Sequence, residues 1–144
     1  MSNKLVKNDK SKRMERIAKL IKEYATEIFR GWDFIIRQKG DGYFVGTARE
    51  SAKGYPLCAL CYVEKETVTI KVVSGGCTFQ KEEVQPIIDE MLFPMTATMM
   101  ADKDLVLKSD MPISCMETDV AILACNRMVT MANALSALLL EKIG

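Results

Sequence analysis

The residues best suited to chemistry in this chain are its cysteines and carboxylates, because it has no histidine. The sequence of 144 residues contains five cysteines, 19 acidic residues and no histidine. The chain therefore lacks the commonest general base and the commonest metal ligand. Catalysis by a Ser-His-Asp or a Cys-His constellation within one chain is excluded.

Cys58-Ala-Leu-Cys61 has the spacing of a metal or redox motif. A zinc knuckle needs both sulfurs on one side of a turn and a second pair elsewhere, and a thioredoxin-like pair lies at a helix N-terminus. The surrounding residues instead predict a strand, in which residues three apart point to opposite faces. We therefore expect buried structural cysteines and no metal.

Ser74-Gly-Gly-Cys-Thr78 precedes a predicted helix and could offer backbone N–H groups to an anion. It lacks the spacing of the known nucleotide-binding loops, so a plain strand-to-helix turn is the better interpretation. The carboxylates of Glu82, Glu83, Asp89 and Glu90 are typical of helix ends and a solvated face. We therefore predict no catalytic residue and no cofactor, and expect the protein not to be an enzyme.

The succession of hydrophobic periods predicts an α+β fold. Residues 1–11 are expected to form a flexible basic tail and residues 12–144 a single domain. The expected helices cover 11–31, 78–92 and 114–142, and the expected strands cover 32–37, 43–49, 57–63, 67–72, 95–100 and 105–108, with a loop at 110–112. This is the order α-β-β-β(-β)-α-β-β-α, and we predict an antiparallel sheet with the helices packed on one face.

Two segments are more apolar than a half-buried element requires. The strand 57–63 has apolar residues on both faces, so we expect it to be central and covered on both sides. Between Val120 and Leu140 the polar positions form only a narrow stripe, Asn126, Arg127, Thr130, Asn133 and Ser136. A helix on the surface of a monomer has a wider polar face. We therefore expect the last helix to be buried on more than one side, partly by a second subunit.

Charge is concentrated at the N-terminus. Residues 1–22 hold eight basic groups and two acidic ones, whereas the chain as a whole has a net charge of +1. We interpret this segment as a solvated face, with contact to nucleic acid or an acidic partner as the alternative. No secretory leader pattern is present, and no window approaches the roughly 18 uninterrupted apolar residues of a membrane span. A cytoplasmic protein is expected.

The ten methionines allow two interpretations. Methionine usually fills cores, but a methionine cluster can also form an adaptable surface that accepts varied peptide segments. The residues predicted to contact a partner or a second subunit are Leu60, Met95, Met99, Met128, Met131, Leu135 and Leu138. On this hypothesis, a charge at Leu135 or Leu138 breaks a dimer without unfolding the protomer.

The order of these elements resembles the type III secretion chaperone-like fold, which includes the YbjN-type sensory transduction regulators. Val84-Gln-Pro-Ile-Ile-Asp-Glu-Met-Leu92 is similar to the middle helix of that group. Asp102-Lys-Asp-Leu-Val-Leu-Lys-Ser-Asp-Met-Pro-Ile113 is similar to its hairpin strand and the loop that follows, and the last helix matches in place and length. The resemblance covers about residues 12–143. It implies a cytoplasmic, non-enzymatic homodimer that binds extended or amphipathic protein segments across apolar patches beside its sheet.

Nucleic-acid binding is the alternative function. The helix–strands–helix order of residues 12–92 also matches a double-stranded RNA-binding domain, and the first helix is basic. That domain contacts phosphates with a lysine-rich start of its second helix, whereas here the start is Lys81-Glu82-Glu83 and mostly repels RNA. We therefore favour protein binding and consider nucleic acid an unlikely partner.

Overall fold

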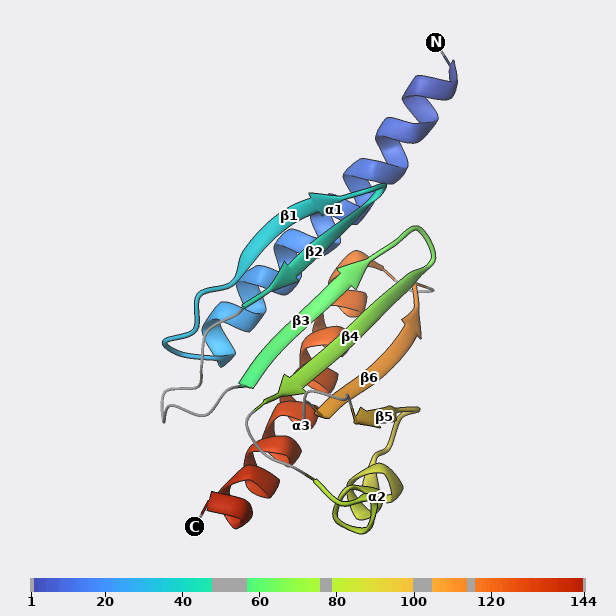
Figure 1. The fold of residues 1–144 in the computed structure, drawn as a ribbon. Coiled ribbons are helices and arrows are strands. Elements are labelled where there is room, and N and C mark those ends of the chain that lie inside the picture. Colours follow the sequence, from blue (N-terminus) through green and yellow to red (C-terminus); the bar gives the residue numbers. More distant parts are fainter. Residues whose placement is uncertain (1, 48–56, 76–78, 100–104, 114–115, 144) are drawn as a thin grey trace.

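The fold is α+β, as predicted. A computed structural model describes residues 2–47, 57–75, 79–99, 105–113 and 116–143, without the side chains of 2–10, 142 and 143. In these residues the elements follow in the order α1 (Ser2–Ile28), β1 (Ile35–Lys39), β2 (Gly42–Gly46), β3 (Leu57–Val63), β4 (Thr67–Ser74), α2 (Lys81–Glu90), β5 (Thr96–Met99), β6 (Leu105–Pro112) and α3 (Glu117–Ile143). Figure 1 shows one sheet with a long helix running along each half of it.

All six strands belong to one antiparallel sheet in the order β1-β2-β3-β4-β6-β5. The first four strands are neighbours in sequence and in space. After α2 the chain returns so that β6 pairs with β4, and β5 becomes the far edge. β3 and β4 are therefore central, as the apolar composition of β3 predicts.

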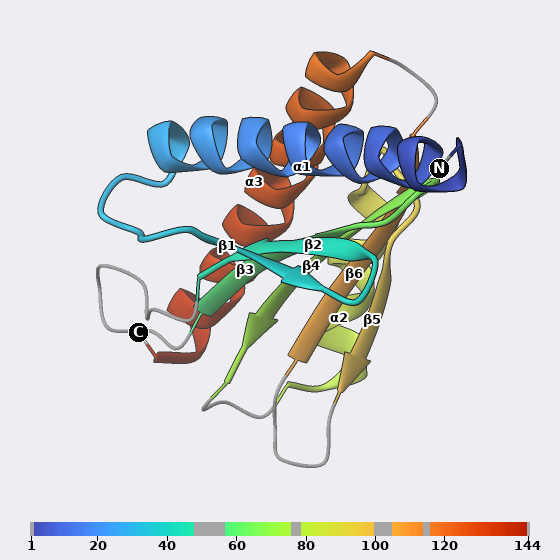
Figure 2. The same cartoon turned by 90° about the horizontal axis from the view of Figure 1, so that it is seen from above.

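One face of the sheet packs against α1 and α3, which cross each other over it (Figure 2). The alternating positions of β4 that face this layer are Val68, Ile70, Val72 and Ser74, and all four are buried. Ile17 and Ile21 of α1 are fully buried in the same core. The period-2 pattern of the strands and the period-3.6 pattern of α1 therefore meet in a single apolar layer.

The helices differ from the prediction at their starts. Residues 2–11, expected to form a flexible tail, continue α1 as helix, and no glycine or proline interrupts 2–28. α2 begins at Lys81 because the backbone N–H of Gln80 donates to Glu83 Oε1 at 3.0 Å, in a capping box. Residues 78 and 114, the expected first residues of the second and third helices, lie outside the described residues.

The strand β6 corrects the expectation of a loop at 110–112. It pairs with β4 over its whole length, from Ser74 opposite Leu105 to Thr67 opposite Pro112. The long pairing partner overrides the turn signal of the Asp-Met-Pro sequence, and the proline is tolerated because it ends the strand.

α3 is long and apolar enough over Glu117–Glu141 to cross a membrane, judged by length and composition alone. The core helix of a folded domain can have the same composition. Here Met128, Met131 and Leu135 are fully buried within the protomer, where α3 packs on the sheet and on α1. Burial by its own chain therefore accounts for part of the apolar surface of α3, whereas Ile122, Leu123 and Leu140 stay exposed.

Candidate functional site

The four residues of α3 that were predicted to contact a partner lie in the core of the protomer. Met128, Met131 and Leu135 have no exposed surface, and Leu138 retains 6%. They contact the sheet and α1 and are not available to a second molecule. The expectation that a charge at Leu135 or Leu138 would leave the protomer folded is therefore wrong, because it would place that charge in the core.

The other three predicted contact residues are not brought together. Leu60 is half-buried on the outer face of β3, the face away from α1 and α3. Met95 packs half-buried against the core beside β5, whereas Met99 at the end of β5 is 48% exposed. The outer residues of β3 (Cys58, Leu60 and Tyr62) are only half-buried, and no described helix covers them. Within the part of the chain that the structure describes, the expected cover on the outer face of this strand is not found.

The two cysteines of the CxxC sequence point to opposite faces of β3, as predicted. Cys61 is fully buried in the core, and Cys58 is half-buried on the outer face. Burial raises the pKa of Cys61 well above its ordinary value, and burial also raises the pKa of Cys125 to about 11. Both buried thiols therefore stay protonated at neutral pH and are poor nucleophiles.

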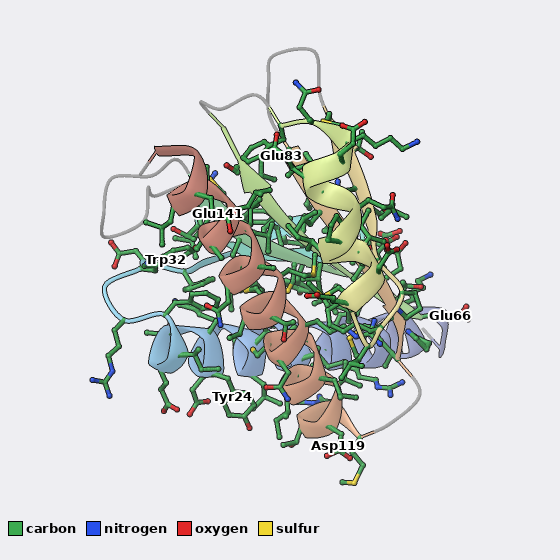
Figure 3. All side chains as sticks on the ribbon, turned by 90° about the horizontal axis from the view of Figure 1, so that it is seen from below. Tyr24, Trp32, Glu66, Glu83, Asp119 and Glu141 are labelled. Atoms are coloured by element: carbon green, nitrogen blue, oxygen red, sulfur yellow. The ribbon has the colours of Figure 1, made fainter. Side chains whose placement is uncertain are left out.

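An apolar surface with two exposed leucines lies between the end of α2 and the outer side of α3. We call it the α2–α3 groove. It is a hollow of about 430 Å³ lined by Glu90, Met91, Leu92, Phe93, Leu123, Asn126, Arg127 and Thr130. Leu92 is fully exposed and Leu123 is 45% exposed. Figure 3 views the molecule from below, with α2 and Glu83 next to α3, which carries Asp119 near its start and Glu141 near its end.

The floor of the α2–α3 groove holds a partly buried cation. Arg127 Nη1 donates to Ser109 Oγ at 3.1 Å and to the Asp110 carbonyl at 3.3 Å, and the guanidinium lies 4.9 Å from the centroid of the Phe93 ring. Glu90 lines the same hollow, but among the described residues no carboxylate forms an ion pair with Arg127. Desolvation lowers the pKa of Arg127. A guanidinium stays charged in proteins, so this site holds a partly desolvated positive charge.

Sequence reasoning missed this groove although a signal was present. Leu92 and Phe93 follow Met91, the residue that caps the end of α2, and Pro94 prevents the helix from continuing over them. An apolar pair between a helix end and a proline is therefore placed at a surface corner unless another element covers it. In the sequence Arg127 belongs to the narrow polar stripe of the last helix, and only the packing of α3 against β6 half-buries it.

The part of the chain that the structure describes contains no group of three or more Cys, Asp or Glu side chains arranged to hold a metal ion. Comparison of the chain with known protein families, with curated protein sequences and with solved structures gave no match.

Proposed function

We propose that this protein is a non-enzymatic, cytoplasmic protein-binding module that holds an apolar segment of a partner protein in the α2–α3 groove. The observation that carries the proposal is the fully exposed Leu92 beside Leu123, at the rim of an apolar hollow with a charged floor. Burying apolar surface gives about 25 cal/mol per Å², so an open leucine pair is a strong anchor for a complementary side chain.

Arg127 indicates a second feature of the proposed partner segment, an acidic side chain. Both of its protein hydrogen bonds leave from Nη1, so Nε and Nη2 have no partner in the described residues. A carboxylate on the partner could accept from these donors in the bidentate geometry that guanidinium favours. We therefore propose an amphipathic or extended segment with apolar residues at the groove and an Asp or Glu facing Arg127.

A homodimer, which the family resemblance implies, stays a prediction. The predicted α3 residues are buried, so a dimer would have to use exposed apolar residues such as Ile122, Leu123 or Leu140. Self-association through the groove would make binding of a partner segment compete with dimer formation. Sedimentation velocity over a range of protein concentrations separates these cases, because only self-association changes the mass with concentration.

The test is selection of binders from a library of random displayed peptides, followed by fluorescence polarisation with each selected peptide. We expect peptides with spaced apolar residues and at least one acidic residue. Leu92→Ser and Arg127→Met should each weaken binding about tenfold, which is ~1.4 kcal/mol. Leu140→Ser is the matched control, since Leu140 is 42% exposed on α3 but does not line the groove.

Circular dichroism of each variant first establishes that the fold is retained. Arg127→Lys keeps the charge and should bind better than Arg127→Met but less well than the wild type, because lysine cannot reproduce the bidentate contact. Equal binding by Leu92→Ser and the wild type would refute the groove. Selected peptides without acidic residues, bound equally by Arg127→Met, would refute the role of Arg127.

A further inference from the structure

The face of the sheet opposite the helices carries an excess of positive charge. We call it the open sheet face, made of the outward positions of the six strands. Four of these positions are basic, and the strands place one carboxylate, Asp110, among them; the basic residues are Arg37, Lys39, Lys71 and Lys108. No described helix covers this face, so its charges face solvent or a ligand.

Two of the lysines oppose each other directly. Lys71 of β4 and Lys108 of β6 are register partners on the open sheet face. Like charges at directly opposite positions of an antiparallel pair are destabilising. Lys108 Nζ lies 3.7 Å from Asp110 Oδ2, and Lys71 has no ion pair within the described residues. A bound anion between the two ammonium groups would offset their repulsion.

Two aromatic rings lie along the same face instead of standing away from it. A Cβ placed on Gly46 would come within 2.8 Å of Phe44 Cζ, so the Phe44 ring extends over that glycine. A Cβ on Gly42 would come within 3.1 Å of Tyr62 Cζ, and Tyr62 Oη donates to the Lys39 carbonyl at 2.6 Å. The glycines thus leave room for rings that lie against the backbone, and both ring residues are half-buried rather than fully covered.

The rings and the lysines border one hollow. It has a volume of about 480 Å³ and is lined by Lys39, Phe44, Leu60, Tyr62, Glu64, Thr69, Lys71 and Lys108. Phe44 lies on β2 and Lys71 on β4, two strand spacings apart, which is roughly 10 Å. Stacking surfaces next to paired cations match a ligand that alternates planar bases with phosphates.

We propose that the open sheet face binds single-stranded RNA, with bases on Phe44 and Tyr62 and phosphates between Lys71 and Lys108. A duplex would offer no free base faces to the rings. RNA fits better than DNA because the Glu64 carboxylate at the edge of the hollow could accept a hydrogen bond from a ribose 2′-hydroxyl, which DNA lacks. This site is separate from the α2–α3 groove and from the basic start of α1.

The experiment measures fluorescence anisotropy of labelled oligouridine with the full chain at several salt concentrations. The variant Lys71→Gln/Lys108→Gln should weaken binding and reduce the slope of log K against log salt by about 1.4, which is roughly 0.7 for each lost phosphate contact. Phe44→Leu should weaken binding about 5-fold or more through lost stacking, whereas Tyr62→Phe keeps the ring and should bind within about 2-fold of the wild type.

The matched charge control is Lys12→Gln/Lys22→Gln, which changes two exposed lysines on α1. This control should keep the part of the slope of log K against log salt that Lys71 and Lys108 contribute. The proposal is overturned if oligouridine does not bind at low salt, or if the α1 control lowers the slope as much as the sheet variant does. Equal affinity for duplex RNA would exclude stacking, and equal affinity for oligothymidine would exclude the role of the 2′-hydroxyl. Since the peptide assay uses other residues, either proposal can fail while the other stands.

Discussion

Replacing Leu135 by alanine is expected to destabilise the protein much more than replacing Leu140 by alanine. Both are leucines of α3, but Leu135 has no exposed surface and Leu140 is 42% exposed. The two substitutions change the helix propensity equally. Any difference between them therefore reports on packing.

The magnitude follows from burial. Removing three carbon groups from a fully buried leucine costs about 2.4 kcal/mol of transfer free energy at 0.8 kcal/mol for each group. A cavity term adds to this, so Leu135→Ala should lower the free energy of unfolding by roughly 3–4 kcal/mol. At Leu140 part of the side chain is already in water and no closed cavity forms, so the loss should be about 1 kcal/mol.

Urea denaturation followed by circular dichroism measures both values, at two or more protein concentrations. We expect equal m values and a difference in the unfolding free energy of at least about 2 kcal/mol, independent of concentration. A concentration-dependent midpoint for Leu135→Ala alone would mean that Leu135 stabilises an oligomer rather than the protomer. Equal losses at the two positions would refute the packing of α3 described above.

Two further predictions concern titratable groups. Arg16 donates from Nε and Nη2 to the Glu117 carboxylate at 2.7–3.0 Å, and this hydrogen bonding lowers the pKa of Glu117. A carboxyl group whose pKa is lowered by folding contributes stability above its unfolded pKa of about 4.3, and this stability is lost as the pH falls through the folded pKa. Glu117→Gln should therefore reduce the loss of unfolding free energy in acid. An unchanged dependence of stability on pH would contradict this. With a pKa of about 11, the Cys125 side chain should be about one part in a thousand thiolate at pH 8. Cys125 and Cys61 should therefore react with iodoacetamide far more slowly in the native protein than in urea, as measured by peptide mass mapping. Rapid labelling of either residue in the native protein would refute their burial.

Local patterns identified most of the elements. The strand 57–63 has the predicted bounds, and the long apolar last helix is present. These succeed because periodicity, glycine turns and prolines act over a few residues. Two local predictions were wrong. The loop predicted at Asp-Met-Pro (110–112) is a strand because it pairs with β4, and the flexible tail predicted at residues 2–11 is helical because α1 continues through it.

Exposure was decided by the tertiary structure. From the sequence, Leu135 and Leu92 are equally apolar, yet the first is fully buried and the second fully exposed. An apolar pattern indicates which side of a helix or strand is apolar, but not whether another part of the chain packs against that side. α3 is part of the core because α1 and α3 cross over one face of the sheet. Phe44, Tyr62 and the opposed Lys71 and Lys108 are at the surface because no described helix covers the other face. That arrangement arises from contacts between residues far apart in the chain, which no local spacing encodes.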